Sequence, residues 1–234
     1  MTHKSGQVPQ IKATLIDHCG SDLSTVNAAR VSFGKASGAV EWLEYDYENG
    51  NRCGDLIAVL EKRDKKLIRY LAKHKHLSPF GHTFASFHVK APIFVARQLV
   101  KHKFLRWNEI SRRYVSDEPD FYVPEVWRGK SADKKQGSEG AVHTNADPDF
   151  VNHTALRTYN EMIAGGVAPE MARMVLPQST MTEWYWSGSL DAFASMCRLR
   201  CASDTQYESR VVADQISRVM GDLFPVSWPA LMGE

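Results

Sequence analysis

Apolar residues alternate or recur at helical spacing along much of the chain, and these patterns predict short strands and helices. Apolar and polar residues alternate from Thr83 to Lys90, which is typical of a strand. Pro92 then suits the first turn of a helix that continues over Ile93 to Lys103. Near the start, the sequence predicts a strand over Ile11 to Asp17 and a helix over Leu23 to Val31.

The patterns between these segments are shorter. Leu56 to Leu60 and Leu67 to Leu71 carry helical spacing and predict two short helices, with Asp64 as a cap between them. Trp107 to Tyr114 is compatible with a helix or with an extended loop, and Phe121 to Val123 predicts a short strand. The middle of the chain is therefore expected to mix helices with extended segments.

Glycine and proline divide the next part of the chain. A helix that includes Leu156 and Ile163 should end at the Gly165–Gly166 pair. Pro169 opens a short helix that contains Arg173, and the following proline, at position 177, ends it.

The last segments combine one β-rich stretch with two helices. Thr180 to Ser187 is rich in β-forming residues, and Ser189 can cap a helix that runs to Arg200. Ser203 can cap the final helix. Its apolar stripe consists of Val212, Ile216, Val219 and Leu223.

Two segments, residues 34–54 and 128–150, lack this patterning and are predicted to be loops, the first with a local hairpin. No linker divides the rest, so residues 1–234 are expected to form one domain. No apolar run is long enough to cross a membrane, and the first ten residues have no signal-peptide core. Four cysteines without a framework of paired spacings indicate reduced thiols in a cytoplasmic protein.

Positive charge is concentrated in the stretch from Arg97 to Tyr114. Its six lysines and arginines and its single acid, Glu109, give it a net charge of +5, whereas the whole chain carries +2. A solvated basic helix face is one explanation. The polar residues interleaved with the charges favour a binding site for anionic groups.

Two other clusters suggest a metal at first. Cys197 and Cys201 lie one helical turn apart, and His74 to His82 (HKHLSPFGH) holds three histidines. Neither spacing matches a common zinc pattern, so no metal site is predicted. The chain also lacks a glycine-rich dinucleotide motif, a phosphate loop and HExxH. Chemistry would therefore depend on a bound cofactor or on positioning and electrostatics.

Lys101-His102-Lys103, seven residues, and then Ser111-Arg112-Arg113 resemble the signature of the flavin-dependent thymidylate synthases, Arg-His-Arg-x7-Ser-x-Arg. Further similar segments occur in the same order: DLSTVNAARVSF, HLSPFGH, FHVKAPIFVARQ, MARMVLP and LRCASDTQYE. The resemblance implies an α+β fold, with a central, mostly antiparallel sheet flanked by helices in a single domain. It also implies a homotetramer whose active sites are shared between subunits.

The resemblance assigns roles to individual residues. Arg200, which would stabilise ionised uracil, and His76, beside the flavin and folate, would be catalytic. The flavin-binding residues would be Ser78 (from a neighbouring subunit), Lys101, His102, Lys103, Glu109, Ser189 and Ser195. The residues that bind dUMP would be Gln98, Lys101, Glu109, Ser111, Arg112, Arg113, Arg173 and Arg200. FAD would be the cofactor, methylenetetrahydrofolate the carbon donor and NADPH the reductant in forming dTMP.

The sequence departs from the family pattern at several of these positions. Lys101 and Lys103 replace arginines, which keeps the charge but removes two planar, bidentate donors. Asp191 stands where relatives carry a cation near the flavin. The alternative hypothesis is a protein that kept the fold, lost catalysis and binds nucleotides or single-stranded nucleic acid through the basic stretch and its aromatic residues.

Overall fold

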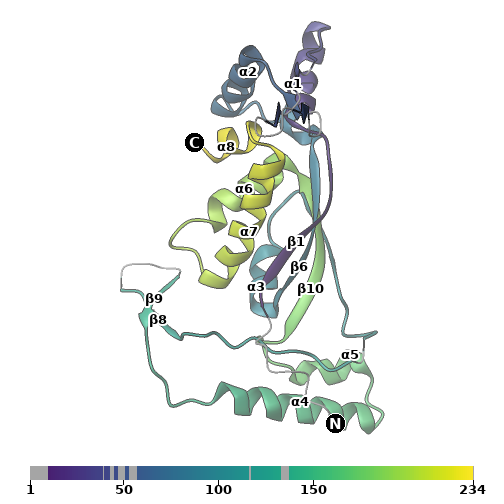
Figure 1. Cartoon of the computed structure of the whole chain (residues 1–234). Helices are drawn as coiled ribbons and strands as arrows, with labels where there is room; N and C mark the ends of the chain where they lie inside the picture. Colours follow the sequence, from purple (N-terminus) through teal and green to yellow (C-terminus); the bar gives the residue numbers. More distant parts are fainter. Residues whose placement is uncertain are drawn as a thin grey trace.

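The computed structural model describes residues 10–38, 60–115, 117–132 and 137–233 (Figure 1). Between 39 and 59 it describes the backbone of four short strands. These are β2 (Val40–Trp42), β3 (Tyr45–Asp46), β4 (Asn51–Arg52) and β5 (Ile57–Val59). Because β3 pairs with β4, the local hairpin expected in the first loop is confirmed.

A four-stranded antiparallel sheet forms the centre of the molecule, with the strand order β1-β6-β10-β7. Its strands are β1 (Lys12–Cys19), β6 (Phe84–Pro92), β10 (Met181–Ser189) and β7 (Leu105–Glu109). Burial alternates along β6 and β10, as the sequence pattern predicts for strands with one covered face. The mixed α+β class is therefore confirmed.

Three helices cover one face of this sheet: α3 (Ile93–Leu99), α6 (Leu190–Arg200) and α7 (Tyr207–Leu223) (Figure 1). Between sheet and helices lies an aromatic core that includes Phe87, Trp184, Trp186 and Phe193, each at most 1% exposed. Burying side chains of this size supplies most of the hydrophobic stabilisation of such a layer.

The remaining elements lie at the two ends of the sheet (Figure 1). At one end are α1 (Asp22–Arg30), η1 (Val31–Phe33), α2 (Lys62–Lys73), η2 (Ser78–His82) and α8 (Ser227–Met232). At the other end are α4 (Pro148–Ala164), α5 (Pro169–Ala172) and η3 (Arg173–Val175). The hairpin of β8 (Arg128–Lys130) and β9 (Ser138–Ala141) leads into α4.

Several predicted elements were wrong. A strand, β5, occupies the apolar run after Leu56, which was predicted to be a helix; a run this short has no distinguishing period. Asp64 does not cap α2 but lies in its first turn, where its buried carboxylate pairs with Arg30. Ser203 does not cap the last helix, because α7 begins at Tyr207.

Three boundaries also changed. The helix expected over Ile93 to Lys103 ends at Leu99, and Phe104 takes a positive φ of 66° where the chain turns into β7. Phe121 forms one isolated bridge with Thr180 in place of a strand. Residues 128–150 are not a plain loop, since they contain β8, β9 and the start of α4.

Cys19, Cys197 and Cys201 are free thiols, and Cys53 lies outside the described residues. Burial of Cys197 raises the pKa of its thiol well above the usual value. Among the described residues, no helix is long and apolar enough to span a membrane, and no three side chains that could bind a metal gather together.

Candidate functional site

A cavity of about 460 Å³, here called the Arg200 cavity, lies between the turn after α3 and the helix α6. It brings together residues that are far apart in sequence and that the family resemblance assigns to one site. They are Lys101, His102, Lys103, Ser195 and Arg200, joined by Leu77, Phe104, Asp191, Ala192, Arg198 and Leu199.

The turn after α3 and the helix α6 position these side chains around the cavity. The backbone N–H of His102 donates to the carbonyl of Leu99 at 3.1 Å, which closes a turn directly after α3. On the other side, α6 begins at Leu190 and ends at Arg200. The hydroxyl of Ser189 donates to the Oδ1 of Asp191 at 2.6 Å, and this carboxylate lies in the first turn of α6, where the helix dipole favours an acid.

The turn and the helix meet in one hydrogen bond. The Nε of Arg200 donates to the Nε2 of His102 at 2.9 Å. Burial, and secondly the charge of Arg200, lower the pKa of His102 from 6.5 to about 4. Burial also lowers the pKa of Arg200. His102 is therefore neutral near pH 7, and its proton lies on Nδ1 because Nε2 accepts.

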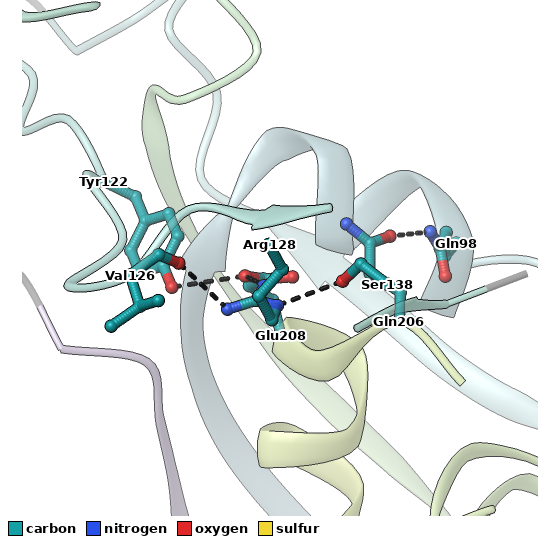
Figure 2. Close-up of polar contacts among 7 residues, drawn as sticks. All are labelled: Gln98, Tyr122, Val126, Arg128, Ser138, Gln206 and Glu208. Carbon is teal, nitrogen blue, oxygen red and sulfur yellow. Dashed lines mark hydrogen bonds and ion pairs between the residues drawn. The ribbon is translucent and has the colours of Figure 1, made fainter. Parts of the chain in front are cut away.

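A second cavity of about 560 Å³, here called the Arg128 cavity, lies beside α3 and the start of α7 (Figure 2). Gln98, one of the residues assigned to dUMP, lines this cavity. Its lining consists of Phe94, Gln98, Tyr122, Pro124, Val126, Trp127, Arg128, Gly137, Ser138, Ser179, Gln206 and Glu208. The amide nitrogen of Gln98 donates to the Oε1 of Gln206, and the hydroxyl of Ser209 donates to the Oε1 of Gln98 at 3.1 Å.

An ion pair forms one wall of the Arg128 cavity (Figure 2). The guanidinium of Arg128 pairs with Glu208, which is 4% exposed. The Nε of Arg128 also donates to the Oγ of Ser138 at 3.0 Å. The same guanidinium lies 4.6 Å from the ring centre of Tyr207. Burial, followed by the charge of Glu208, raises the pKa of Tyr122 to about 12. The charges of Arg128 and Glu208 compensate each other, so the pair leaves this wall close to neutral.

Glu109 and the arginines that follow lie at the edge strand β7. Both carboxylate oxygens of Glu109 accept hydrogen bonds, from the hydroxyl of Thr182 at 2.7 Å and from the indole of Trp107 at 3.1 Å. The Nε of Arg113 donates to the Oγ of Ser111 at 3.0 Å.

The neighbouring arginine is held differently, because Arg112 donates to the backbone carbonyl of Asp117. Arg112 is therefore anchored to its own loop, whereas Arg113 remains an exposed cation beside Ser111.

Other predicted residues do not line the Arg200 cavity of this one chain. Arg173 lies in η3 with its Nε donating to the carbonyl of Glu170 at 3.2 Å, and it is exposed. His76 stacks on Tyr70 with ring centres 6.3 Å apart. Ser78 is exposed at the start of η2, although Leu77, between these two residues, does line the cavity.

Several polar residues near Gln98 were not predicted. Gln206 is the N-cap residue of α7, and Glu208 and Ser209 lie in its first turn. Gln206 and Glu208 entered the sequence analysis only as part of the matching segment LRCASDTQYE. Arg128 was assigned to a loop because its surroundings are rich in glycine, serine and lysine. A motif indicates which residues match, but it does not indicate which of them meet across the fold.

Comparisons with known proteins identify the family of the chain. The family model described as "Thymidylate synthase complementing protein" matches residues 14–226. The chain is 38% identical to a flavin-dependent thymidylate synthase from Thermus thermophilus, covering 92% of this chain and 73% of that protein. It is 35% identical to one from Kosmotoga olearia, covering 93% and 88%.

Solved structures give a similar result. The UMP/dUMP methylase PolB from Streptomyces cacaoi, bound with 5-Br dUMP, superimposes with a TM-score of 0.75 at 30% identity. The match covers 96% of this chain and 95% of PolB. The complex of the same methylase with 5-Br UMP gives 0.74 at 29% identity.

Proposed function

Because the chain belongs to the flavin-dependent thymidylate synthase family, an enzyme family of methyltransferases that use a flavin, we propose that it converts dUMP to dTMP. The flavin is FAD, the carbon donor methylenetetrahydrofolate and the reductant NADPH. The observation that carries the proposal is the Arg200 cavity, where Lys101 and Lys103 of the signature lie with Arg200, an arginine suited to an ionised imide.

The chemistry of the Arg200 cavity fits a flavin dinucleotide. Lys101 and Lys103 supply charge for its pyrophosphate, and the hydroxyl of Ser195 can donate or accept. Asp191 adds an acid to this wall, but its Oδ1 already accepts from Ser189. The bound flavin would supply the hydride that completes the methyl group.

Side chains of the protein, and not the flavin, would position dUMP. A guanidinium fork pairs with a phosphate or with the edge of an imide through parallel hydrogen bonds. Arg113 with Ser111, together with Arg173, serves the phosphate, and Arg200 faces the uracil. An arginine beside the imide favours its anion, because the positive charge lowers the pKa of the nearby acid.

Within one chain, these groups lie on separate elements, which supports a site assembled from several subunits in a homotetramer. Large apolar side chains are exposed next to the proposed site residues: Phe104 (85%), Tyr114 (78%) and Met174 (73%). Apolar surface of this kind indicates contact with another protein surface.

We expect the purified protein to be a tetramer, with a mass by light scattering about four times the 26.4 kDa of the chain. A stable monomer at micromolar concentration that still turns over dUMP would contradict shared active sites. Phe104→Asp should shift the mass towards smaller species, whereas Val151→Asp, at an exposed position on α4, should not.

The proposed function predicts a yellow protein that oxidises NADPH in a dUMP-dependent manner and that produces dTMP when methylenetetrahydrofolate is also present. UMP should be tested in parallel, since the similar methylase PolB is described as acting on both nucleotides. A protein without bound flavin and without dUMP-dependent turnover would refute the proposal. Oligonucleotide binding that weakens steeply with salt would then support the alternative of a nucleic-acid-binding protein.

A further inference from the structure

The hydrogen bond between Arg200 and His102 has a fixed direction. Every nitrogen of a guanidinium is a donor and none is an acceptor. The 2.9 Å contact from Nε to Nε2 therefore requires a histidine whose Nε2 is unprotonated. Since one imidazole nitrogen is committed to Arg200, only the Nδ1–H of His102 remains for a bound ligand.

The same bond fixes the orientation of the guanidinium. Nε lies at the root of the planar group, so holding it at His102 sets the plane and leaves the two terminal nitrogens as a pair. Arg200 is only partly buried and ends α6, where a long side chain would otherwise sample several rotamers. His102 is held in turn by the backbone bond that closes the turn after Leu99.

We propose that His102 is a positioning residue for Arg200, which holds the guanidinium by accepting from its Nε and thereby aims the two terminal nitrogens at the uracil. This role rests on the proposed function and differs from the flavin contact that the signature motif implies. It also gives the motif histidine a role that the flanking lysines cannot share, because an ammonium group has no acceptor.

A neutral His102 supports this geometry. The pKa of about 4 keeps Nε2 free to accept near neutral pH. The charged groups that share the cavity are Lys101 and Lys103 on the turn, and Asp191, Arg198 and Arg200 on α6. Four of these five are cations, and they disfavour a further positive charge on the imidazole.

Two isosteric substitutions separate the positioning role from a flavin-binding role. In His102→Gln the side-chain oxygen can take the place of Nε2, whereas in His102→Asn the amide nitrogen can take the place of Nδ1–H. We expect His102→Gln to keep kcat within about 3-fold of wild type. We expect His102→Asn to lower kcat on the order of 10- to 100-fold while its Kd for flavin and its flavin content stay unchanged. If His102 mainly holds flavin, the Gln variant loses flavin and the Asn variant keeps it.

The pH dependence of stability gives a readout independent of turnover. The pKa of His102 is lower in the folded protein, so the unfolded chain binds more protons between pH 4 and 6.5, and this contribution to stability is lost as pH falls through that window. The rise in Tm from pH 5 to pH 7 should be smaller in both variants than in wild type, because the other charged groups are unchanged.

Measurement of the wild-type protein alongside distinguishes the possible failures. An active wild type with equal kcat in the Gln and Asn variants would overturn the role of His102 and leave the proposed function intact. So would a loss of activity in His102→Asn that follows its loss of flavin. An inactive wild type would overturn the proposed function and, with it, the positioning role.

Discussion

Replacing Arg200 by alanine is expected to leave a folded flavoprotein that scarcely forms dTMP, with kcat lowered on the order of 100- to 1,000-fold. The guanidinium is the cation of the Arg200 cavity that faces the uracil in the proposed site. The other arginine of this cavity, Arg198, donates instead to the carbonyl of Leu231 at 2.7 Å. The positive charge of Arg200 stabilises the imide most strongly when the imide is ionised, and the alanine variant lacks this charge. A preorganised charge of this kind acts on the transition state more than on the bound substrate.

The measurement is kcat and KM for dUMP, together with the flavin content from the visible spectrum. Arg200→Lys should recover only part of kcat, because lysine keeps the charge and loses the planar fork. Arg63→Ala serves as a control, since this arginine on α2 is 65% exposed and pairs with Glu61 at 2.7 Å. An Arg200→Ala enzyme with nearly wild-type kcat would refute the role of the residue.

Arg200 also shows what a sequence can predict of a site. The motif around it was recognisable, and its helix was expected to start near Ser189 and to reach Arg200, as observed. Its contact with His102, across 98 positions of sequence, was not predicted. Contacts over such a separation depend on how the sheet and helices pack. Neither the periodicity nor the composition of the sequence predicts this packing.

Part of β7 lies in the segment from Trp107 to Tyr114, for which the sequence predicted either a helix or an extended loop. Within Leu105 to Glu109 the apolar residues Leu105 and Trp107 alternate with polar ones, which is a strand pattern, but the preceding basic run resembles a helix face. Packing decides the outcome, because the ring of Trp107 stacks on Trp184 at 4.3 Å. By contrast, the alternation over Thr83 to Lys90 was unambiguous because both its period and its flanking proline agreed.

The largest stability effect near the site is expected for Glu208→Ala. Glu208 is 4% exposed, and its carboxylate pairs with Arg128, whose side chain is 23% exposed (Figure 2). Without the carboxylate, a largely buried guanidinium has lost its counter-charge, and Tyr122 loses the acceptor of its hydroxyl at 3.4 Å. Breaking such a pair from one side costs about 3 kcal/mol of unfolding free energy.

The effect should reach dUMP through Gln98. Gln206 is the N-cap residue of α7 and Ser209 lies in its first turn beside Glu208, and both hydrogen-bond to the Gln98 amide. Loosening this end of α7 would misorient an amide assigned to the nucleotide. We therefore expect KM for dUMP to rise more than kcat falls, while flavin binding in the Arg200 cavity is retained.

Denaturant unfolding at fixed protein concentration measures the stability change, since the proposed tetramer would gain stability by mass action. The double variant Arg128→Met with Glu208→Leu should recover most of the loss, because removing both charges leaves none buried and unpaired. Glu161→Ala is the matched control: its carboxylate lies 3.9 Å from Arg157 with both side chains 72% exposed, and it should change stability by less than about 0.5 kcal/mol. Equal losses in the single and double variants would show that packing around Glu208, and not its pairing with Arg128, stabilises this wall.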